Sequence, residues 1–238
     1  LGYPGTMGTE YIDYIIADKI IIPKENFDYY SEKVLHLPDC YQPNMREKDI
    51  SIKKYKRSDF DLPENGFIYC CFNNNYKITP NIFDIWMKIL KEVPNSILWL
   101  FKSNETTLKN LKKETEARGV DPNRIIFTSY LPNKEHLKRI SLADLFLDTY
   151  PCNAHTTASD AIRMGIPILT LTGNSFASRV GASILSSVGL KELITSNEKE
   201  YQELAIELAI RPDKLSKLKK RTKDSVFKSS LFDSHLYT

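Results

Sequence analysis

Short apolar segments alternate with amphipathic segments along most of this chain, and this alternation restricts the fold more than any other feature. The apolar segments predict strands at 67–72, 96–101, 124–129, 145–148 and 167–171, with a short one near Leu193. The segments between them predict helices at 80–92, 105–118, 134–142, 157–164 and 175–188, followed by two helices that end near Lys228. Strands separated by helices form βαβ units, in which the strands are parallel. The sequence therefore predicts an α/β fold, a Rossmann-like parallel sheet with helices on both faces.

The part of the chain before residue 66 has a different character. Residues 10–22 are rich in β-branched and aromatic side chains, which is typical of a strand, and residues 25–33 predict a short helix. Residues 43–65 are charged and have almost no apolar pattern, so we expect a linker or a long surface loop there. This divides the chain into a fragment at 1–42, the linker, and a lobe at 66–238.

Composition argues against several classes of protein. The 33 Lys and Arg residues exceed the 30 Asp and Glu residues by only three, which implies no nucleic acid partner. No apolar run approaches the roughly 18 residues of a membrane-spanning helix. The four cysteines lack CxxC spacing, so neither a zinc site nor a disulfide framework is indicated, and we expect a reducing, cytoplasmic location. The chain opens without an initiator Met or a signal-like segment, so we expect it to begin inside a longer protein.

Four common catalytic signatures are absent from the sequence. There is no GxGxxG after the first strand, no GxxxxGK[ST], no HExxH and no GxSxG. Their absence argues against a dinucleotide dehydrogenase, a P-loop NTPase, a zinc protease and a serine hydrolase. The predicted sheet remains compatible with sugar-nucleotide chemistry.

A polar loop at 148–160 joins one predicted strand to the next predicted helix. The first turn of a helix offers unpaired N–H groups and a partial positive charge, which together favour phosphate. His155, Thr156 and Thr157 add further donors, so the loop predicts a nucleotide or nucleotide-sugar site. Thr157 and Asp160 also have the spacing of a capping box, which is an ordinary helix start. The residues alone leave both interpretations open.

Other polar loops are expected at the same edge, because parallel strands all point their carboxyl ends the same way. Thr79 and Pro80 have the pattern of an N-cap and a first helical residue, which leaves Lys77 at the edge. Lys77 can stand over a diphosphate as a point charge, or can simply be solvated. A further loop at 172–175 contains a glycine that permits close backbone approach.

The loop after the strand at 124–129 leads into a helix with two basic side chains on neighbouring turns. Asn133 is expected to be the N-cap of this helix, and His136 and Arg139 follow it. The His136 ring can stack on a base. It can equally be a surface histidine near a helix start.

Several segments resemble the catalytic region of O-linked N-acetylglucosamine transferases and SPINDLY-like proteins, glycosyltransferase family 41. They are LGYPGTMG, YCCFNNNYKITP, VPNSILWLF, RIIFTSYLPNKEHLKR, LADLFLDTYPCNAHTTASDA and ASRVGASIL, in the order of the family and across nearly the whole chain. The resemblance implies a GT-B architecture of two Rossmann-like lobes, with residues 66–238 as the C-terminal lobe that holds the donor. It also implies inverting, metal-independent transfer of N-acetylglucosamine from UDP-GlcNAc to Ser or Thr of protein acceptors, without a cofactor.

The resemblance assigns roles to residues at two ends of the expected donor site. Lys77 matches the lysine that contacts the donor diphosphate and stabilises the leaving nucleotide, which makes it the expected catalytic residue. Asn74 stands where the animal enzymes have a phosphate-contacting glutamine. His136 matches the histidine that packs on the base, and Leu131 and Arg139 match residues that hold the edge of the base.

The remaining matches surround the pyrophosphate and the ribose. His155, Thr156 and Thr157 match the pyrophosphate loop, and Asp160 matches an acidic residue on the ribose. Asn133 stands where the animal enzymes carry a ribose-contacting lysine. This difference leaves the donor open, because SPINDLY relatives use a GDP-sugar.

The resemblance also marks what this chain lacks. Leu1 and Gly2 match the edge of the sugar pocket, whereas the rest of the N-terminal lobe, its catalytic histidine and the tetratricopeptide repeats that carry acceptors are missing. We therefore expect the isolated chain to be inactive. Two other functions remain open: protein O-fucosyl transfer from GDP-fucose, and a non-catalytic sugar-nucleotide-binding or scaffolding module of a repeat protein.

Overall fold

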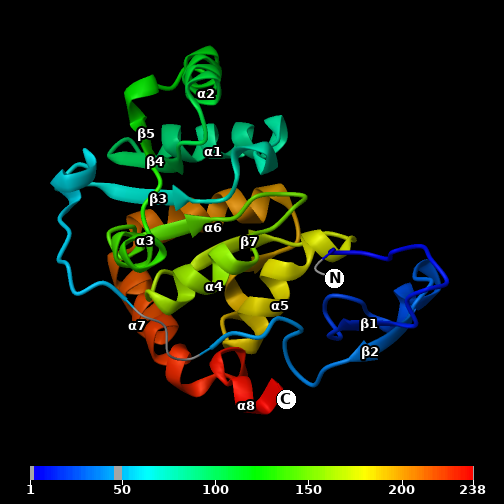
Figure 1. Ribbon diagram of the computed structural model, residues 1–238. Coiled ribbons are helices and arrows are strands. Elements are labelled where there is room, and N and C mark those ends of the chain that lie inside the picture. Colours follow the sequence, from blue (N-terminus) through cyan, green and yellow to red (C-terminus); the bar gives the residue numbers. More distant parts are fainter. Residues whose placement is uncertain (1–2, 46–49, 238) are drawn as a thin grey trace.

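The computed structural model describes residues 3–45 and 50–237, and a parallel sheet forms its centre (Figure 1). The strands lie in the order β5-β4-β3-β6-β7-β8, and every neighbouring pair is parallel. Their bounds are β3 Phe67–Cys71, β4 Ser96–Phe101, β5 Ile125–Thr128, β6 Leu145–Leu147, β7 Ile168–Leu171 and β8 Ile194–Thr195. The predicted α/β class and the parallel pairing are confirmed.

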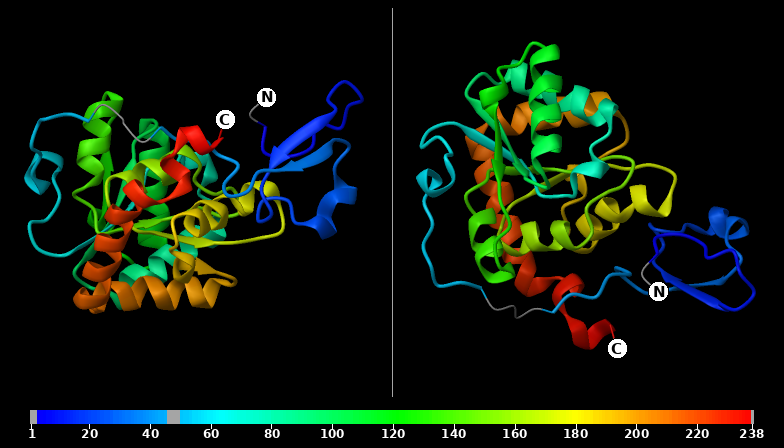
Figure 2. Two further views of the ribbon diagram at one scale, coloured as in Figure 1. Left: turned by 90° about the horizontal axis from the view of Figure 1, so that it is seen from below. Right: turned by 45° about the horizontal axis from the view of Figure 1, so that its top comes forward.

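Helices cover both faces of this sheet (Figures 1 and 2). On one face α1 contacts α6, and on the other α4 contacts both α3 and α5. Their bounds are α1 Pro80–Glu92, α2 Glu105–Ala117, α3 Asn133–Ile140, α4 Thr156–Arg163, α5 Val180–Ser187, α6 Glu198–Ile210, α7 Pro212–Lys228 and α8 Ser234–Tyr237. Because consecutive strands are joined through helices, all their carboxyl ends meet at one edge.

Helix starts show where local chemistry was predicted correctly and where it was not. Thr79 caps α1 by accepting from Ile82 N, with Pro80 at the first helical position, as predicted. The prediction of Asn133 as an N-cap is wrong, because α3 begins at Asn133 and Pro132 is its N-cap. The helix predicted at 175–188 is interrupted, since Ser175 caps a separate 3-10 turn before α5 begins.

The N-terminal segment forms a small parallel sheet of its own. Strand β1 (Tyr14–Ala17) pairs with β2 (Lys33–His36), and the helix expected between them is the 3-10 helix η1 (Lys24–Tyr29). The segment is attached to α5 through a buried hydrogen bond of 2.5 Å, in which Ser183 Oγ donates to Asp18 Oδ2. Residues 43–65, where they are described, contain no α-helix or strand, only the 3-10 helix η2 (Arg57–Phe60). The division at 1–42, 43–65 and 66–238 stays a prediction.

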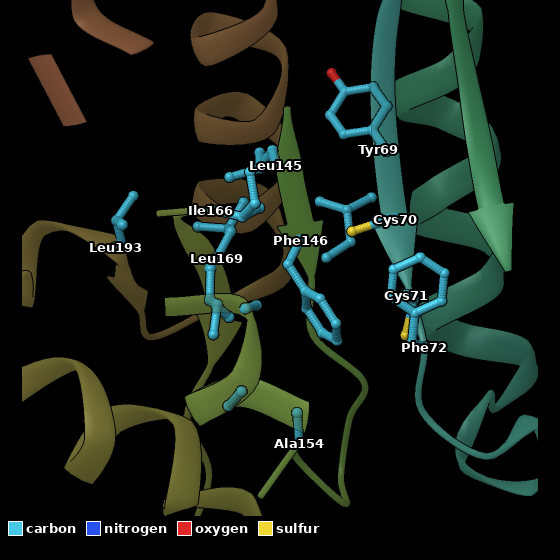
Figure 3. Close-up of a cluster of buried hydrophobic side chains, with 14 of the residues drawn as sticks. Tyr69, Cys70, Cys71, Phe72, Leu145, Phe146, Ala154, Ile166, Leu169 and Leu193 are labelled. Atoms are coloured by element: carbon cyan, nitrogen blue, oxygen red, sulfur yellow. The ribbon is translucent and has the colours of Figure 1, made fainter. Parts of the chain in front are cut away.

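The core lies on the faces of the sheet, between its strands and the helices that cover them, and Figure 3 shows the part around β3 and β6. Tyr69, Cys70 and Cys71 are fully buried on β3, and Phe146 of β6 is buried beside them. All four cysteines are free thiols, and burial raises the pKa of Cys70 and Cys71. Within the described ranges, no helix is long and apolar enough to cross a membrane.

The Thr79 cap gives a first test of how α1 is held. Thr79 Oγ1 also donates to Tyr150 O at 3.0 Å, so one hydroxyl joins the helix start to the loop after β6. We expect Thr79→Ala to lower the free energy of unfolding in urea by about 1 to 2 kcal/mol. The matched control is Thr106→Ala on the exposed side of α2. An equal effect of the two substitutions would contradict the assigned cap.

Candidate functional site

A pocket of about 500 Å³ opens at the carboxyl edge of the sheet, between the loops that follow β3, β5 and β6. We call it the edge pocket. The structure brings most of the predicted site residues together in its wall, namely Asn74, Lys77, Leu131, Asn133, His136, Arg139, His155, Thr156 and Thr157. Side chains from three separate loops therefore face one cavity, as the parallel sheet requires.

Lys77 ends the 3-10 helix η3 (Asn75–Lys77), two residues before Thr79, the N-cap of α1. Its Nζ donates to Asn153 O at 2.8 Å, which attaches the ammonium group to the β6–α4 loop (residues 148–155). An ammonium has three N–H donors, and this contact uses one. Lys77 and the start of α4 therefore lie on the same rim of the edge pocket.

His155 is the N-cap of α4 and forms part of the pocket wall. Its Nε2 is buried and has no hydrogen-bond partner in the part of the chain that the structure describes. Burial, with a smaller contribution from the charge of Lys77, lowers the pKa of His155 to about 4, so the imidazole is neutral at neutral pH. A buried ring nitrogen without a partner in a pocket wall indicates a place where a ligand atom completes the hydrogen bonding.

The first turn of α4 supplies backbone donors. The N–H groups of Thr156 and Thr157 precede the first intrahelical bonds, which begin with Ala158 N donating to His155 O. Thr157 Oγ1 donates to Asn73 Oδ1 at 2.5 Å, so the capping box with Asp160 is not formed. At Thr157 the backbone N–H, and not the hydroxyl, is the donor that stays available.

A buried carboxylate that sequence analysis missed organises the β6–α4 loop. Asp148 Oδ1 accepts from Thr149 N at 2.8 Å and from Ala154 N at 2.6 Å, and its Oδ2 accepts from Thr170 Oγ1 at 2.7 Å. Asn73 Nδ2 donates to Thr149 Oγ1 at 2.7 Å. Burial raises the pKa of Asp148 to about 7. The only sequence signal for this role is the position of Asp148 at the end of a strand.

The opposite end of the pocket is built on α3. The His136 ring packs edge-on against Phe72, with centroids 5.2 Å apart. Arg139 Nε donates to His136 Nδ1 at 2.9 Å, and its Nη1 donates to Ser129 O at 2.6 Å and to Thr128 Oγ1 at 3.0 Å. Burial lowers the pKa of Arg139 to about 10, which leaves it charged at neutral pH. Arg139 therefore orients the imidazole through the proton that it donates.

Among the predicted site residues that the structure describes, Asp160 is not part of this arrangement. Asp160 is buried in α4 and does not line the edge pocket. Leu1 and Gly2 lie outside the described residues. A second pocket of about 370 Å³ lies between the N-terminal segment and His155. Among the described residues, no group of three or more His, Cys, Asp or Glu is arranged to hold a metal ion.

Comparison with known proteins identifies a matching family and similar sequences. Residues 1–44 and 43–238 match the family model described as Glycosyl transferase family 41. The chain is 41% identical over 240 residues to "Probable UDP-N-acetylglucosamine--peptide N-acetylglucosaminyltransferase SEC" of Arabidopsis thaliana, covering 98% of this chain and 25% of that protein. It is 34% identical over 247 residues to the SPINDLY protein of Petunia hybrida, which is named as a probable enzyme of the same kind. This match covers 100% of this chain and 26% of that protein.

A solved structure gives the same picture of the fold. A mutant O-GlcNAc transferase of Thermobaculum terrenum superposes with a TM-score of 0.88 and 29% sequence identity, covering 98% of this chain and 45% of that chain. The fold is thus that of the C-terminal lobe of a GT-B glycosyltransferase. The chain spans about a quarter of the length of the curated relatives.

Proposed function

This chain belongs to glycosyl transferase family 41, and we propose that it forms the donor-binding part of a protein O-GlcNAc transferase. The reaction is inverting transfer of N-acetylglucosamine from UDP-GlcNAc to a Ser or Thr hydroxyl of a protein. The names of the two plant relatives support this choice, since both give UDP-N-acetylglucosamine as the donor and peptide as the acceptor.

One observation carries the proposal: the contact between Lys77 Nζ and Asn153 O, which holds an ammonium group beside the first turn of α4. In the transfer step the acceptor hydroxyl gives its proton to the catalytic base of the upstream lobe, and its oxygen bonds to the anomeric carbon while the bond from that carbon to the diphosphate breaks. The electron pair stays on the diphosphate, so negative charge grows there. Lys77 and the helix start stabilise this charge, and the step accordingly needs no metal ion.

The other pocket residues divide between the two ends of the nucleotide. We propose that His155 Nε2 and Asn74 contact the diphosphate, beside the backbone N–H groups of α4. His136 and Leu131 hold the base, and Asn133 lies toward the ribose. Asp160 has no proposed ligand contact, since it does not line the edge pocket.

The small sheet of β1 and β2 supports the proposal that a further lobe belongs to the active protein. Tyr14 is 53% exposed and Ile16 is 51% exposed on β1, although parallel strands are normally covered on both faces. We propose that upstream residues complete this sheet as an N-terminal lobe with the catalytic base, and that tetratricopeptide repeats bring protein acceptors. Such a protein is expected in the cytoplasm, and this chain alone binds the donor without turnover.

Calorimetry on the full-length protein with UDP, GDP and their sugars tests the donor assignment. We expect UDP and UDP-GlcNAc to bind at least about tenfold more tightly than GDP and GDP-fucose, a difference of about 1.4 kcal/mol. Tight binding of GDP with no response to UDP would instead support O-fucosyl transfer. UDP binding without any transfer to a peptide acceptor would support a non-catalytic module.

A further inference from the structure

The segment at residues 50–60, which we call the strap, contacts the first turn of α3. Ser51 N donates to Lys134 O at 3.2 Å, and the Tyr55 hydroxyl donates to Glu135 Oε2. Lys53 Nζ lies 3.8 Å from the same carboxylate. Three strap residues thus contact two consecutive residues of α3, and all of these contacts lie on the turn that also carries Asn133 and His136.

Ring contacts continue from the strap into the wall of the edge pocket. The Tyr55 ring packs edge-on against Phe60 with centroids 5.1 Å apart, and Phe60 lies 5.5 Å from Trp99. Trp99 packs against Phe72 at 5.1 Å, and Phe72 packs against His136 at 5.2 Å. Tyr55 therefore supports α3 in two ways, through its hydroxyl to Glu135 and through a series of rings that ends on His136.

The length of α3 makes these contacts consequential. A helix of eight residues is not stable in isolation, so tertiary contacts must fix its first turn. Leu137, Arg139 and Ile140 are buried and fix the side of α3 that faces the protein interior. The strap fixes the other side of the first turn of α3, where Glu135 accepts a hydrogen bond from the Tyr55 hydroxyl.

We propose that Tyr55 is a positioning residue for the base end of the edge pocket, so that the strap sets the affinity for UDP without touching the nucleotide. This inference rests on the proposed function. Tyr55 is absent from the pocket wall and acts through α3, which carries His136 and Asn133. The diphosphate end is anchored independently, because Lys77 and the start of α4 are held by Asn153, Asn73 and the β6–α4 loop. The strap should therefore influence binding of the base and not of the diphosphate.

Tyr55→Phe in the full-length protein tests this, since Phe keeps the ring contact with Phe60 and removes only the hydroxyl donated to Glu135. Calorimetry with UDP and with inorganic pyrophosphate separates the two ends of the pocket. We expect the dissociation constant for UDP to rise about three- to tenfold, with pyrophosphate binding unchanged. In kinetics the donor KM should rise by the same factor, while kcat at saturating donor stays constant. Glu135→Ala, which removes the acceptor of the Tyr55 hydroxyl, should produce a similar change, and combining it with Tyr55→Phe should add little.

Tyr29→Phe, on an exposed tyrosine of η1 away from the pocket, is the matched control and should leave both affinities unchanged. Unchanged UDP affinity in Tyr55→Phe would overturn the positioning role while leaving the proposed function intact. Equal weakening of UDP and pyrophosphate would also overturn it, because that result indicates a general loss of structure. Failure of the unmodified protein to bind UDP would overturn both proposals.

Discussion

Replacing Lys77 with Met is expected to reduce transfer by the full-length protein about 100- to 1,000-fold, with the fold unchanged, because one preorganised donor to the growing negative charge is lost. Met has nearly the same length and no charge, so the substitution removes the electrostatic contribution and little packing. In the folded protein the Lys77 ammonium donates to Asn153 O at 2.8 Å and is only partly buried. The measurement is kcat with UDP-GlcNAc and a peptide acceptor, together with urea unfolding of the same variant.

Lys88→Met is the matched control, because Lys88 is exposed on α1 and does not line the edge pocket. This variant should transfer at the rate of the unmodified protein. Near-normal turnover of Lys77→Met would remove the assigned role of the ammonium group. A large loss of unfolding free energy in Lys77→Met would mean that the lysine acts on the fold instead of on the diphosphate.

Local sequence signals are sufficient to predict the bounds of a helix or strand when its first residues and its apolar pattern are both visible in the sequence. The bounds of α1 and β4 agree with the prediction to the residue, because Thr79 and Pro80 mark the helix start and a run of five apolar residues after Ser96 marks the strand. The edge pocket could be anticipated for a related reason. Parallel strands fix which loops meet, so the sequence alone predicts Lys77 and His155 at one edge of the sheet.

Contacts between distant residues were not visible in the sequence. Thr157 and Asp160 have the spacing of a capping box. The Thr157 hydroxyl instead donates to Asn73, which lies 84 residues earlier in the chain. The sequence predicts only a linker or surface loop for the strap, because its partner Glu135 is 80 residues from Tyr55 and a lone tyrosine in a charged segment gives no periodic signal. Strand β2 has only four residues, too few for an alternating pattern to distinguish it from a loop.

A glycine on α5 shows how closely the site depends on such distant packing. Gly181 N donates to Asn153 Oδ1 at 3.2 Å, and Asn153 O is the acceptor that holds Lys77. A Cβ at position 181 would lie 2.3 Å from Thr170 Oγ1 and 2.8 Å from Asp148 Oδ2. Real Cβ atoms essentially never approach so closely, so either α5 or the buried Asp148 carboxylate must move. The absence of a side chain at Gly181 thus lets α5 pack onto β7 and lets the β6–α4 loop keep its anchor.

Gly181→Ala is accordingly expected to lower the free energy of unfolding by about 2 to 5 kcal/mol, despite the better helix propensity of Ala, because overpacking and the loss of a buried hydrogen bond to Asp148 add together. The displaced loop should also weaken UDP binding, since Asn153 then holds Lys77 less firmly. Urea unfolding and UDP calorimetry measure the two effects on the same preparation. Ser186→Ala on the same helix is the control and should change neither quantity appreciably. If Gly181→Ala were as stable as Ser186→Ala, α5 would have room to shift, and the close packing of Gly181 on Thr170 and Asp148 could not be what holds the loop.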